Sequence, residues 1–326
     1  MRRGPCAFGG RFLARNILLT GGAGFIGAAL ARELVERGER VVVVDNLSTG
    51  KRENVPPRAE FIELDLSRAD FVAHLPQGKF DAVCHLAAQS SGEISGEDPL
   101  YDVRTNALST LLLSRWCASN GTARFLYASS MAIYGNPRDV PVAEDSACEP
   151  MSFYGISKWA SENYLRLAAH SGLSSTSLRM FSVYGPGQNM GNLKQGMASI
   201  FMAYMLRGEE VPVTGSLSRF RDFVYIDDVV DAWLKTLAVP ATPAAAYNVG
   251  CGQAITVRVL LQELRGALRL PADYPIKEHP GLLSDQFGIF ADIGLIERDL
   301  NWKPRIDLAT GLTRMEQWVR SGAWRS

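Results

Sequence analysis

Tyr154 and Lys158 are two residues whose chemical types and spacing suit proton transfer. They open a predicted helix of residues 154–170, in which residues four apart lie on one face. An ammonium group beside a phenol favours the phenolate and lowers the pKa of the phenol, so that tyrosine becomes a usable base near neutral pH. Because Tyr-x-x-x-Lys occurs by chance in many helices, the pair needs support from elsewhere in the chain.

A serine pair, Ser129 and Ser130, supplies that support at the end of a predicted strand just upstream. Open α/β sheets bind their ligands at the carboxyl ends of the strands, so these hydroxyls lie where a ligand is expected. Ser130 can hydrogen-bond the substrate oxygen that Tyr154 deprotonates, while a cofactor carries the redox step. The alternative is that the serines and Tyr134 only form a turn.

A glycine-rich turn predicts which cofactor this is. Thr20-Gly-Gly-Ala-Gly-Phe-Ile-Gly27 lies between a predicted strand and a predicted helix, and it contains G-x-G-x-x-G. Such a turn lets backbone amides and a helix N-terminus approach a pyrophosphate. Asp45 ends the next strand, where a carboxylate accepts hydrogen bonds from the adenosine ribose and repels a 2′-phosphate, so NAD is favoured over NADP. Nearby Lys51 and Arg52 could bind a 2′-phosphate, so NADP remains an alternative cofactor. Asp45 could also be an ordinary turn residue.

The elements that position these residues alternate along the chain. Strands are predicted at 16–20, 40–45, 59–64, 82–86, 124–129 and 176–181, and helices at 25–37, 100–119 and 154–170. This alternation predicts an α/β fold, a doubly wound parallel sheet of the Rossmann type. The irregular remainder predicts a smaller α+β substrate-binding cap. We expect an N-terminal extension at 1–15, a cofactor-binding domain at 16–181 to which 222–248 returns, and a cap formed by 182–221 and 249–326.

Composition excludes several classes of protein. The 326 residues carry 34 Lys and Arg against 34 Asp and Glu, which makes nucleic acid and anionic membranes poor partners. The five cysteines are scattered without paired spacing, so we expect reduced thiols and no metal site. No apolar run is long enough for a membrane helix and no export signal is visible, so we expect a cytoplasmic protein.

Taken together, these motifs resemble the extended short-chain dehydrogenase/reductases, and specifically the nucleotide-sugar epimerase and dehydratase group that includes UDP-glucose 4-epimerase. The resemblance covers almost the whole chain and rests on residues 20–27, Asp45-Asn46-Leu47, Asp65-Leu66, His85-Leu-Ala-Ala88, Asn106, Ser129-Ser130, Tyr154-x-x-x-Lys158, Leu178-Arg-Met-Phe181, Tyr184-Gly-Pro-Gly187 and Arg221-Asp-Phe-Val-Tyr-Ile-Asp-Asp228.

The resemblance implies a role for each matching residue. Tyr154 would be the base, Lys158 would bind the nicotinamide ribose, and Ser130 would hold the sugar hydroxyl. The residues implied to bind NAD, besides Tyr154 and Lys158, are Gly21, Gly24, Phe25, Ile26, Gly27, Asp45, Asn46, Asp65, Leu66, Leu86, Ala87, Ala88, Ser90, Asn106 and Phe181. Those implied to bind the nucleotide sugar, besides Ser130, are Ser182, Asn192, Leu193, Val213, Arg221 and Asp285.

The residues after Ser130 discriminate among the reactions of the group. Dehydratases of this group carry an Asp-Glu pair there, because elimination of water needs its own base and acid, whereas this chain has Met131 and Ala132. Decarboxylases place a glutamate in this segment, and reductases typically take NADPH. The sequence therefore predicts a nucleotide-sugar epimerase acting through a transient 4-keto sugar. A dehydratase or 4-keto reductase on the same scaffold is the alternative, and a non-enzymatic NAD-binding regulatory protein is a more distant one.

The chain departs from the group's pattern at two places. Ser182 stands where an asparagine is usual, and Leu282-Leu-Ser-Asp285 keeps the aspartate of a typical Arg-x-Gly-Asp without its arginine. Glu93 could meet sugar hydroxyls or cap a helix. Apolar residues on the two long helices, among them Leu108, Leu111, Leu112, Trp116, Trp159 and Leu165, predict a homodimer through a helical bundle or, alternatively, simple core packing.

Overall fold

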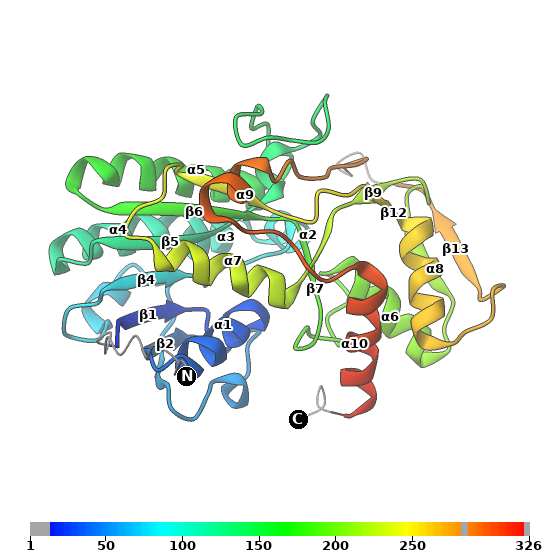
Figure 1. Ribbon diagram of the computed structural model, residues 1–326, viewed down its shortest axis with the longest axis horizontal. Coiled ribbons are helices and arrows are strands. Elements are labelled where there is room, and N and C mark those ends of the chain that lie inside the picture. Colours follow the sequence, from blue (N-terminus) through cyan, green and yellow to red (C-terminus); the bar gives the residue numbers. More distant parts are fainter. Residues whose placement is uncertain (1–13, 282–285, 323–326) are drawn as a thin grey trace, which may run out of the picture.

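The computed structural model of the protein describes residues 14–281 and 286–322. A seven-stranded parallel sheet forms its centre (Figure 1). In sheet order the strands are β11 (Ala246–Val249), β6 (Ser174–Met180), β5 (Arg124–Ser130), β4 (Ala82–His85), β1 (Asn16–Thr20), β2 (Arg40–Asp45) and β3 (Glu60–Glu63). The order reverses at β1, as in a doubly wound sheet, so the predicted fold class is confirmed.

The strand sequences explain why the sheet is covered on both faces. In β2, Val41 and Val43 belong to one core cluster while Val42 and Val44 belong to another, because successive side chains point to opposite faces. A run of β-branched residues without polar alternation suits such a strand.

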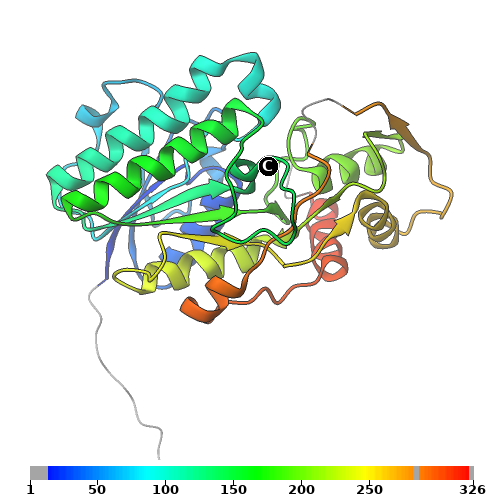
Figure 2. The same cartoon turned by 90° about the horizontal axis from the view of Figure 1, so that it is seen from above.

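Helices form a layer on each face of the sheet (Figure 2). The pair α1 (Phe25–Glu36) and α7 (Ile226–Ala238) packs together on one face. On the other face α4 (Ser109–Asn120) lies beside α5 (Phe153–Ala168). The expected helix at 100–119 is instead a continuous run of three segments: α3 (Pro99–Asp102), a π-helix (Val103–Leu108) and α4. Local periodicity does not distinguish a π-helix from an α-helix.

The smaller part of the molecule is built from helices and short two-stranded sheets. The helices are α6 (Met197–Arg207), α8 (Val257–Leu268) and α10 (Leu308–Arg320). The sheets pair β7 (Ser182–Tyr184) with β10 (Phe223–Tyr225), β9 (Phe220–Arg221) with β12 (Ile255–Thr256), and β8 (Val211–Thr214) with β13 (Ile276–His279). One hydrophobic cluster runs from the central sheet into these helices, so the two parts share a continuous core.

The chain passes between the two parts more than once. Strand β11 pairs with β6 at the edge of the central sheet, and α7 packs against that sheet. The segment after residue 222 therefore returns to the central part. Farther on, α9 (Gly294–Leu300) contacts β11, and the Trp302 indole donates a hydrogen bond of 3.0 Å to the Asp228 carbonyl of α7. The exact domain division stays a prediction, and residues 1–13 of the expected extension lie outside the described residues.

The remaining described elements are short. They are α2 (Gly92–Glu97) and the 3₁₀ turns at Arg52–Asn54, Phe71–His74, Met131–Tyr134 and Ala169–Ser171. Within residues 14–281 and 286–322, no helix is both long and apolar enough to cross a membrane. Cys84, Cys117, Cys148 and Cys251 carry free thiols.

Candidate active site

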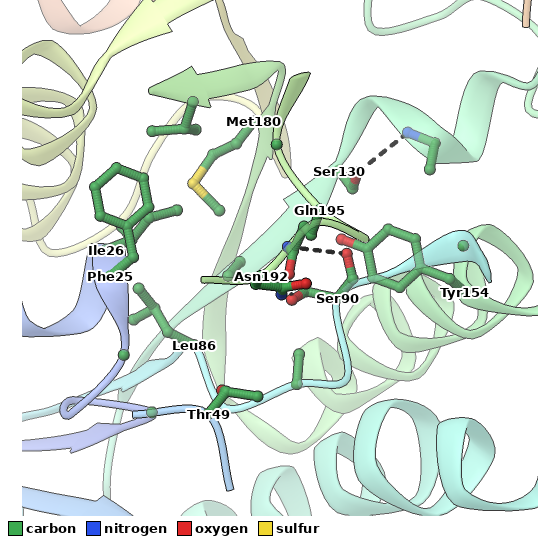
Figure 3. A pocket seen from close by; sticks show the side chains of 18 of the residues that line it. Phe25, Ile26, Thr49, Leu86, Ser90, Ser130, Tyr154, Met180, Asn192 and Gln195 are labelled. Atoms are coloured by element: carbon green, nitrogen blue, oxygen red, sulfur yellow. Dashed lines mark hydrogen bonds between the residues drawn. The ribbon is translucent and has the colours of Figure 1, made fainter. Parts of the chain in front are cut away.

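A cavity of about 1470 Å³ lies between the carboxyl edge of the central sheet and the smaller part. Single-ligand pockets usually measure about 300–1,000 Å³, so this one has room for two bound molecules side by side. Figure 3 shows part of its lining, with Phe25, Ile26 and Leu86 on one side and Ser130 and Tyr154 on the other. Residues predicted from separate parts of the sequence therefore face a common space.

The glycine turn at the start of α1 fits a dinucleotide. A Cβ on Gly27 would lie 2.1 Å from the Gly21 carbonyl oxygen, so the turn can close only with glycine there. A Cβ on Gly24 would meet only that same oxygen, at 3.4 Å, and Gly24 lines the cavity. No side chain caps the first turn of α1, which leaves its amides facing the cavity for a pyrophosphate.

Asp45 lies at the end of β2, buried at the edge of the cavity. One carboxylate oxygen accepts the Ala23 amide at 3.0 Å and the other accepts the Leu47 amide at 2.9 Å. The carboxylate is thereby fixed in place, and each oxygen keeps a second lone pair for a ribose hydroxyl. Arg52 is engaged elsewhere, 4.5 Å from the centre of the Phe61 ring, while Lys51 lines the cavity.

The other predicted cofactor residues are brought to the same cavity, with one exception. Asn46, Asp65, Leu66, Leu86, Ala87, Ala88, Ser90 and Phe181 all line it, as do Gly21, Phe25, Ile26 and Gly27. Asn106 does not. It is buried behind the wall, where its side-chain amide donates to the Gln89 carbonyl and to Asp102, each at 2.9 Å. Its contact with the cavity is indirect, through the loop that contains Gln89.

Ser130, Tyr154 and Lys158 converge on the cavity from two elements. Ser130 ends β5 and accepts the Ala132 amide at 3.2 Å, and Figure 3 shows its hydroxyl and the Tyr154 phenol on the same side of the cavity. Lys158 is 2% exposed and donates to the Ala128 carbonyl of β5 at 2.8 Å. Its Nζ lies 5.7 Å from the centre of the Tyr154 ring.

Burial controls the proton affinities of this group. It raises the pKa of Tyr154 to about 12, although the nearby Ser130 hydroxyl opposes the rise. Burial also lowers the pKa of Lys158 to about 7, against the attraction of Asp102 and Glu162. The expected lowering of the Tyr154 pKa by Lys158 is therefore not found, because desolvation disfavours both the phenolate and the ammonium.

A buried ion pair supports the strand that carries the serines. The Ser129 hydroxyl donates to Glu162 of α5 at 2.5 Å, and Glu162 pairs with Arg179 of β6 at 2.8 Å. Arg179 also donates to the Tyr134 hydroxyl at 2.9 Å. Ser129 and Tyr134 therefore belong to a structural network, while Ser130 faces the cavity.

The predicted substrate residues are only partly brought together. Ser182, Asn192 and Arg221 line the cavity, whereas Leu193 packs against the core and Val213 is 2% exposed within it. In β8 alternate residues face the core, so Val213 points inward with Val211. Asp285 and Leu282 lie outside the described residues. The Arg221 guanidinium donates to the Phe220 and Gln286 carbonyls, each at 2.7 Å.

Sequence reasoning missed a bridge across the cavity. The Gln195 side chain donates to the Ser90 hydroxyl at 2.8 Å and to the Ser90 carbonyl at 3.1 Å (Figure 3). Next to it, Lys194 pairs with Glu97 at 2.6 Å and with Glu93 at 3.3 Å. Glu93 both lines the cavity and lies in the first turn of α2, and the N-cap of that helix is Ser91. These contacts join residues about a hundred positions apart, which no local pattern signals.

Comparison with known proteins agrees with this geometry. The profile of the "NAD dependent epimerase/dehydratase family" matches residues 17–250. A putative UDP-glucose 4-epimerase of Methanocaldococcus jannaschii is 33% identical over 307 residues, covering 94% of this chain and 98% of the relative. A nucleotide-sugar reductase and a dehydratase also match, each at 29% identity.

Solved structures match over the same length. The UDP-glucose 4-epimerase of Thermotoga maritima with UDP-glucose has a TM-score of 0.88 and 36% identity, covering 94% of this chain and 99% of that one. The UDP-glucose 4-epimerase of Thermus thermophilus in complex with NAD has a TM-score of 0.85 and 33% identity, with the same coverage. The cofactor is NAD, in agreement with the glycine turn and Asp45, and the chain belongs to the NAD dependent epimerase/dehydratase family of enzymes.

Proposed function

We propose that this enzyme is a nucleotide-sugar 4-epimerase whose substrate is a UDP-sugar. The observation that carries the proposal is the environment of Tyr154: Ser130 lies beside it, and Met131 and Ala132 line the same cavity. Neither Met131 nor Ala132 can accept or donate a proton, so elimination of water across C5 and C6 has no acid or base there. Similarity to UDP-glucose 4-epimerases over most of the chain supports the choice of nucleotide and reaction.

In this proposal Tyr154, in its phenolate form, takes the proton of the C4 hydroxyl while Ser130 hydrogen-bonds the same oxygen. Bound NAD supplies the reversible hydride acceptor that this chemistry needs. The C4 hydroxyl thus becomes a carbonyl, the sugar turns within the cavity, and Tyr154 returns the proton after the C–H bond has re-formed on the other face. Lys158 holds the nicotinamide ribose, and the buried site keeps the keto sugar from water.

The remaining assignments belong to the same proposal. Asp45 binds the adenosine ribose, Asp65 and Leu66 flank the adenine, and Leu86, Ala87, Ala88 and Ser90 lie along the dinucleotide. Ser182 and Asn192 face the sugar, and Arg221 contacts the diphosphate, for which its planar guanidinium is suited.

A panel of UDP-sugars incubated with purified enzyme tests the proposed function. The expected result is a product of unchanged mass with inverted configuration at C4, formed by the wild type and at least 100-fold more slowly by Tyr154→Phe, in line with the usual contribution of a general base of about 10²–10⁴. Undiminished turnover by Tyr154→Phe would remove Tyr154 from the mechanism. A product lighter by one water, or heavier by two hydrogens, would favour the dehydratase or the reductase.

We also propose that the enzyme is a homodimer through the outer faces of α5 and of the continuous helical run from α3 to α4. Leu165 is buried in the monomer core, and Leu112, Trp116 and Trp159 pack against core clusters, so part of the predicted apolar surface is accounted for by the monomer. Other apolar side chains stay exposed, namely Leu100 on α3, Val103 on the π-helix and Leu167 on α5. Sedimentation should show a dimer that Leu100→Glu with Val103→Glu converts to monomer, and a monomeric wild type would contradict the proposal.

A further inference from the structure

Asp102 is a buried carboxylate directly behind the proposed catalytic pair. It ends α3, and its side chain is 0% exposed. Its oxygens accept three hydrogen bonds, from the Ser157 hydroxyl at 2.6 Å, the Asn106 amide at 2.9 Å and the Gln89 amide at 3.1 Å. All three donors are neutral. A buried carboxylate whose hydrogen-bond partners are neutral is costly, so its retention in the core requires an explanation.

The three hydrogen-bond partners of Asp102 come from three different segments around the site. Gln89 belongs to the loop of residues 86–91, which carries Leu86, Ala87, Ala88 and Ser90 to the cavity. Asn106 lies in the π-helix, and a π-helical turn inside an α-helix often marks a functional site. Ser157 lies on α5, immediately before Lys158.

Further contacts tie the same segments together. The Asn106 side chain donates to the Gln89 carbonyl at 2.9 Å, and the Ser161 hydroxyl of α5 donates to the Asn106 carbonyl at 3.2 Å. Residues 154, 157, 158 and 161 are spaced three or four apart, so they share one face of α5. The face that presents Tyr154 and Lys158 is thus the face that is anchored at Asp102.

We propose that Asp102 is a positioning residue for the Tyr154–Lys158 pair: it fixes α5 through Ser157, fixes the cofactor loop through Gln89, and supplies the negative charge that keeps Lys158 an ammonium ion. The inference rests on the proposed roles of Tyr154 and Lys158. Asp102 does not line the cavity, so it acts through these residues and not on the substrate.

The other charged and titratable groups around Lys158 explain why Asp102 is needed to keep Lys158 positively charged. Glu162 on α5 also attracts Lys158, but it is paired with Arg179 at 2.8 Å. Tyr127 on β5 places its ring centre 4.8 Å from the Lys158 Nζ, and burial raises the pKa of that phenol, so it stays neutral. His85 on β4 is also neutral, since burial lowers its pKa to about 3. Asp102 has only neutral hydrogen-bond partners; burial raises its pKa, and the Ser157 hydroxyl and the charge of Lys158 oppose that rise.

Asp102→Asn removes the charge with little change of shape. Its carbonyl oxygen can keep the two amide donors, and its new amide group can donate to the Ser157 hydroxyl, which also accepts. Ser161→Ala is the matched control, because it removes a buried hydroxyl from the same face of α5 without touching Asp102. The main readout is the titration of Lys158, followed by NMR in protein with ¹³Cε-labelled lysine. The chain has seven lysines, and the Lys158 signal is assigned by its loss in Lys158→Met.

The expected result is a fall of the Lys158 pKa by about one unit or more in Asp102→Asn, the usual effect of removing one nearby opposite charge. At a pH where wild-type Lys158 is charged and that of the variant is not, NAD should bind several-fold more weakly. The kcat should fall at least about tenfold, with the KM for the sugar changed less than about threefold, because Asp102 does not contact substrate. Ser161→Ala should keep the wild-type Lys158 pKa.

An unchanged Lys158 pKa in Asp102→Asn would overturn the inference. If that variant does not fold, Asp102→Ser removes the same charge and takes its place. Failure of both to fold, with Ser161→Ala folded, would assign Asp102 to fold stability alone and would also overturn it. The titration needs no sugar substrate, so a wild type that epimerises no UDP-sugar would refute the proposed function without deciding the role of Asp102.

Discussion

The Lys158 Nζ lies 5.7 Å from the centre of the Tyr154 ring while it donates a 2.8 Å hydrogen bond to the Ala128 carbonyl. The ammonium group therefore faces the phenol without bonding to it, and its position is fixed by β5, the strand that carries Ser130. Helix α5 and strand β5 together set the distance between the Tyr154 phenol and the Ser130 hydroxyl. Because a backbone carbonyl of the protein holds Lys158 in place, the pKa of Lys158 can be measured without substrate and without turnover.

Lys158 should give the folded protein a specific pH dependence. Its pKa is about 7 in the fold, against an ordinary value of 10.5. Between these values the unfolded chain holds the extra proton, so Lys158 makes the free energy of unfolding rise with pH across that window. The difference in unfolding free energy between wild type and Lys158→Met should rise by up to about 1.4 kcal/mol per pH unit from about pH 7 to about pH 10.

Urea unfolding at half-unit pH intervals measures that difference. Lys277→Met, at an exposed position, is the control for the loss of a lysine as such. A flat difference between wild type and Lys158→Met would mean that Lys158 titrates alike in the folded and unfolded states.

Alanine substitution should lower stability at one glycine of the cofactor turn and NAD affinity at another. In Gly27→Ala the new methyl would lie 2.1 Å from the Gly21 carbonyl oxygen, so the turn itself must distort and the protein should lose about 2 kcal/mol of stability or more. In Gly24→Ala the methyl has room within the protein, at a position that lines the cavity. That variant should keep the wild-type melting temperature and bind NAD at least tenfold more weakly by calorimetry. Wild-type NAD affinity in a folded Gly24→Ala would contradict the placement of the pyrophosphate.

The buried pair of Glu162 and Arg179 should contribute far more than exposed pairs do. Arg179→Met leaves Glu162 buried without its hydrogen-bonded cation, which costs about 3–5 kcal/mol by analogy with other broken buried pairs. Arg305→Met, which breaks an exposed pair with Asp231, should cost less than about 1 kcal/mol. Chemical denaturation measures the free energy of unfolding of both variants. Equal losses of that free energy would show that the Glu162–Arg179 pair contributes no more to stability than an exposed pair.

Much of this arrangement was predictable because it rests on local signals. The valines of β2, the glycine turn and the spacing of Tyr154 and Lys158 are short-range patterns, and each predicted strand of the central sheet forms within two residues of its expected bounds. The carboxyl ends of parallel strands meet at one edge, so Ser130 and Asp45 could be assigned to a common site from the sequence alone.

What the sequence did not reveal depends on contacts between distant residues. Asp102 resembles any acidic residue of a helix, and only the fold places it against Ser157 and Gln89. Gln195 meets Ser90 because the loop before α6 crosses the cavity. Val213 was expected to approach the base of the nucleotide, but its side chain is 2% exposed and belongs to the core. The proton affinities of Tyr154 and Lys158 likewise depend on burial, which spacing alone does not give.

The most direct test of the account is the fate of the hydrogen at C4. A UDP-sugar that the panel identifies as a substrate, labelled with deuterium at C4, is converted by the wild-type enzyme, and the product is examined by NMR and mass spectrometry. The proposed 4-epimerase should give a C4-inverted product of unchanged mass that retains deuterium at C4. Loss of the deuterium to solvent, or a product lighter by one water, would contradict the proposed function.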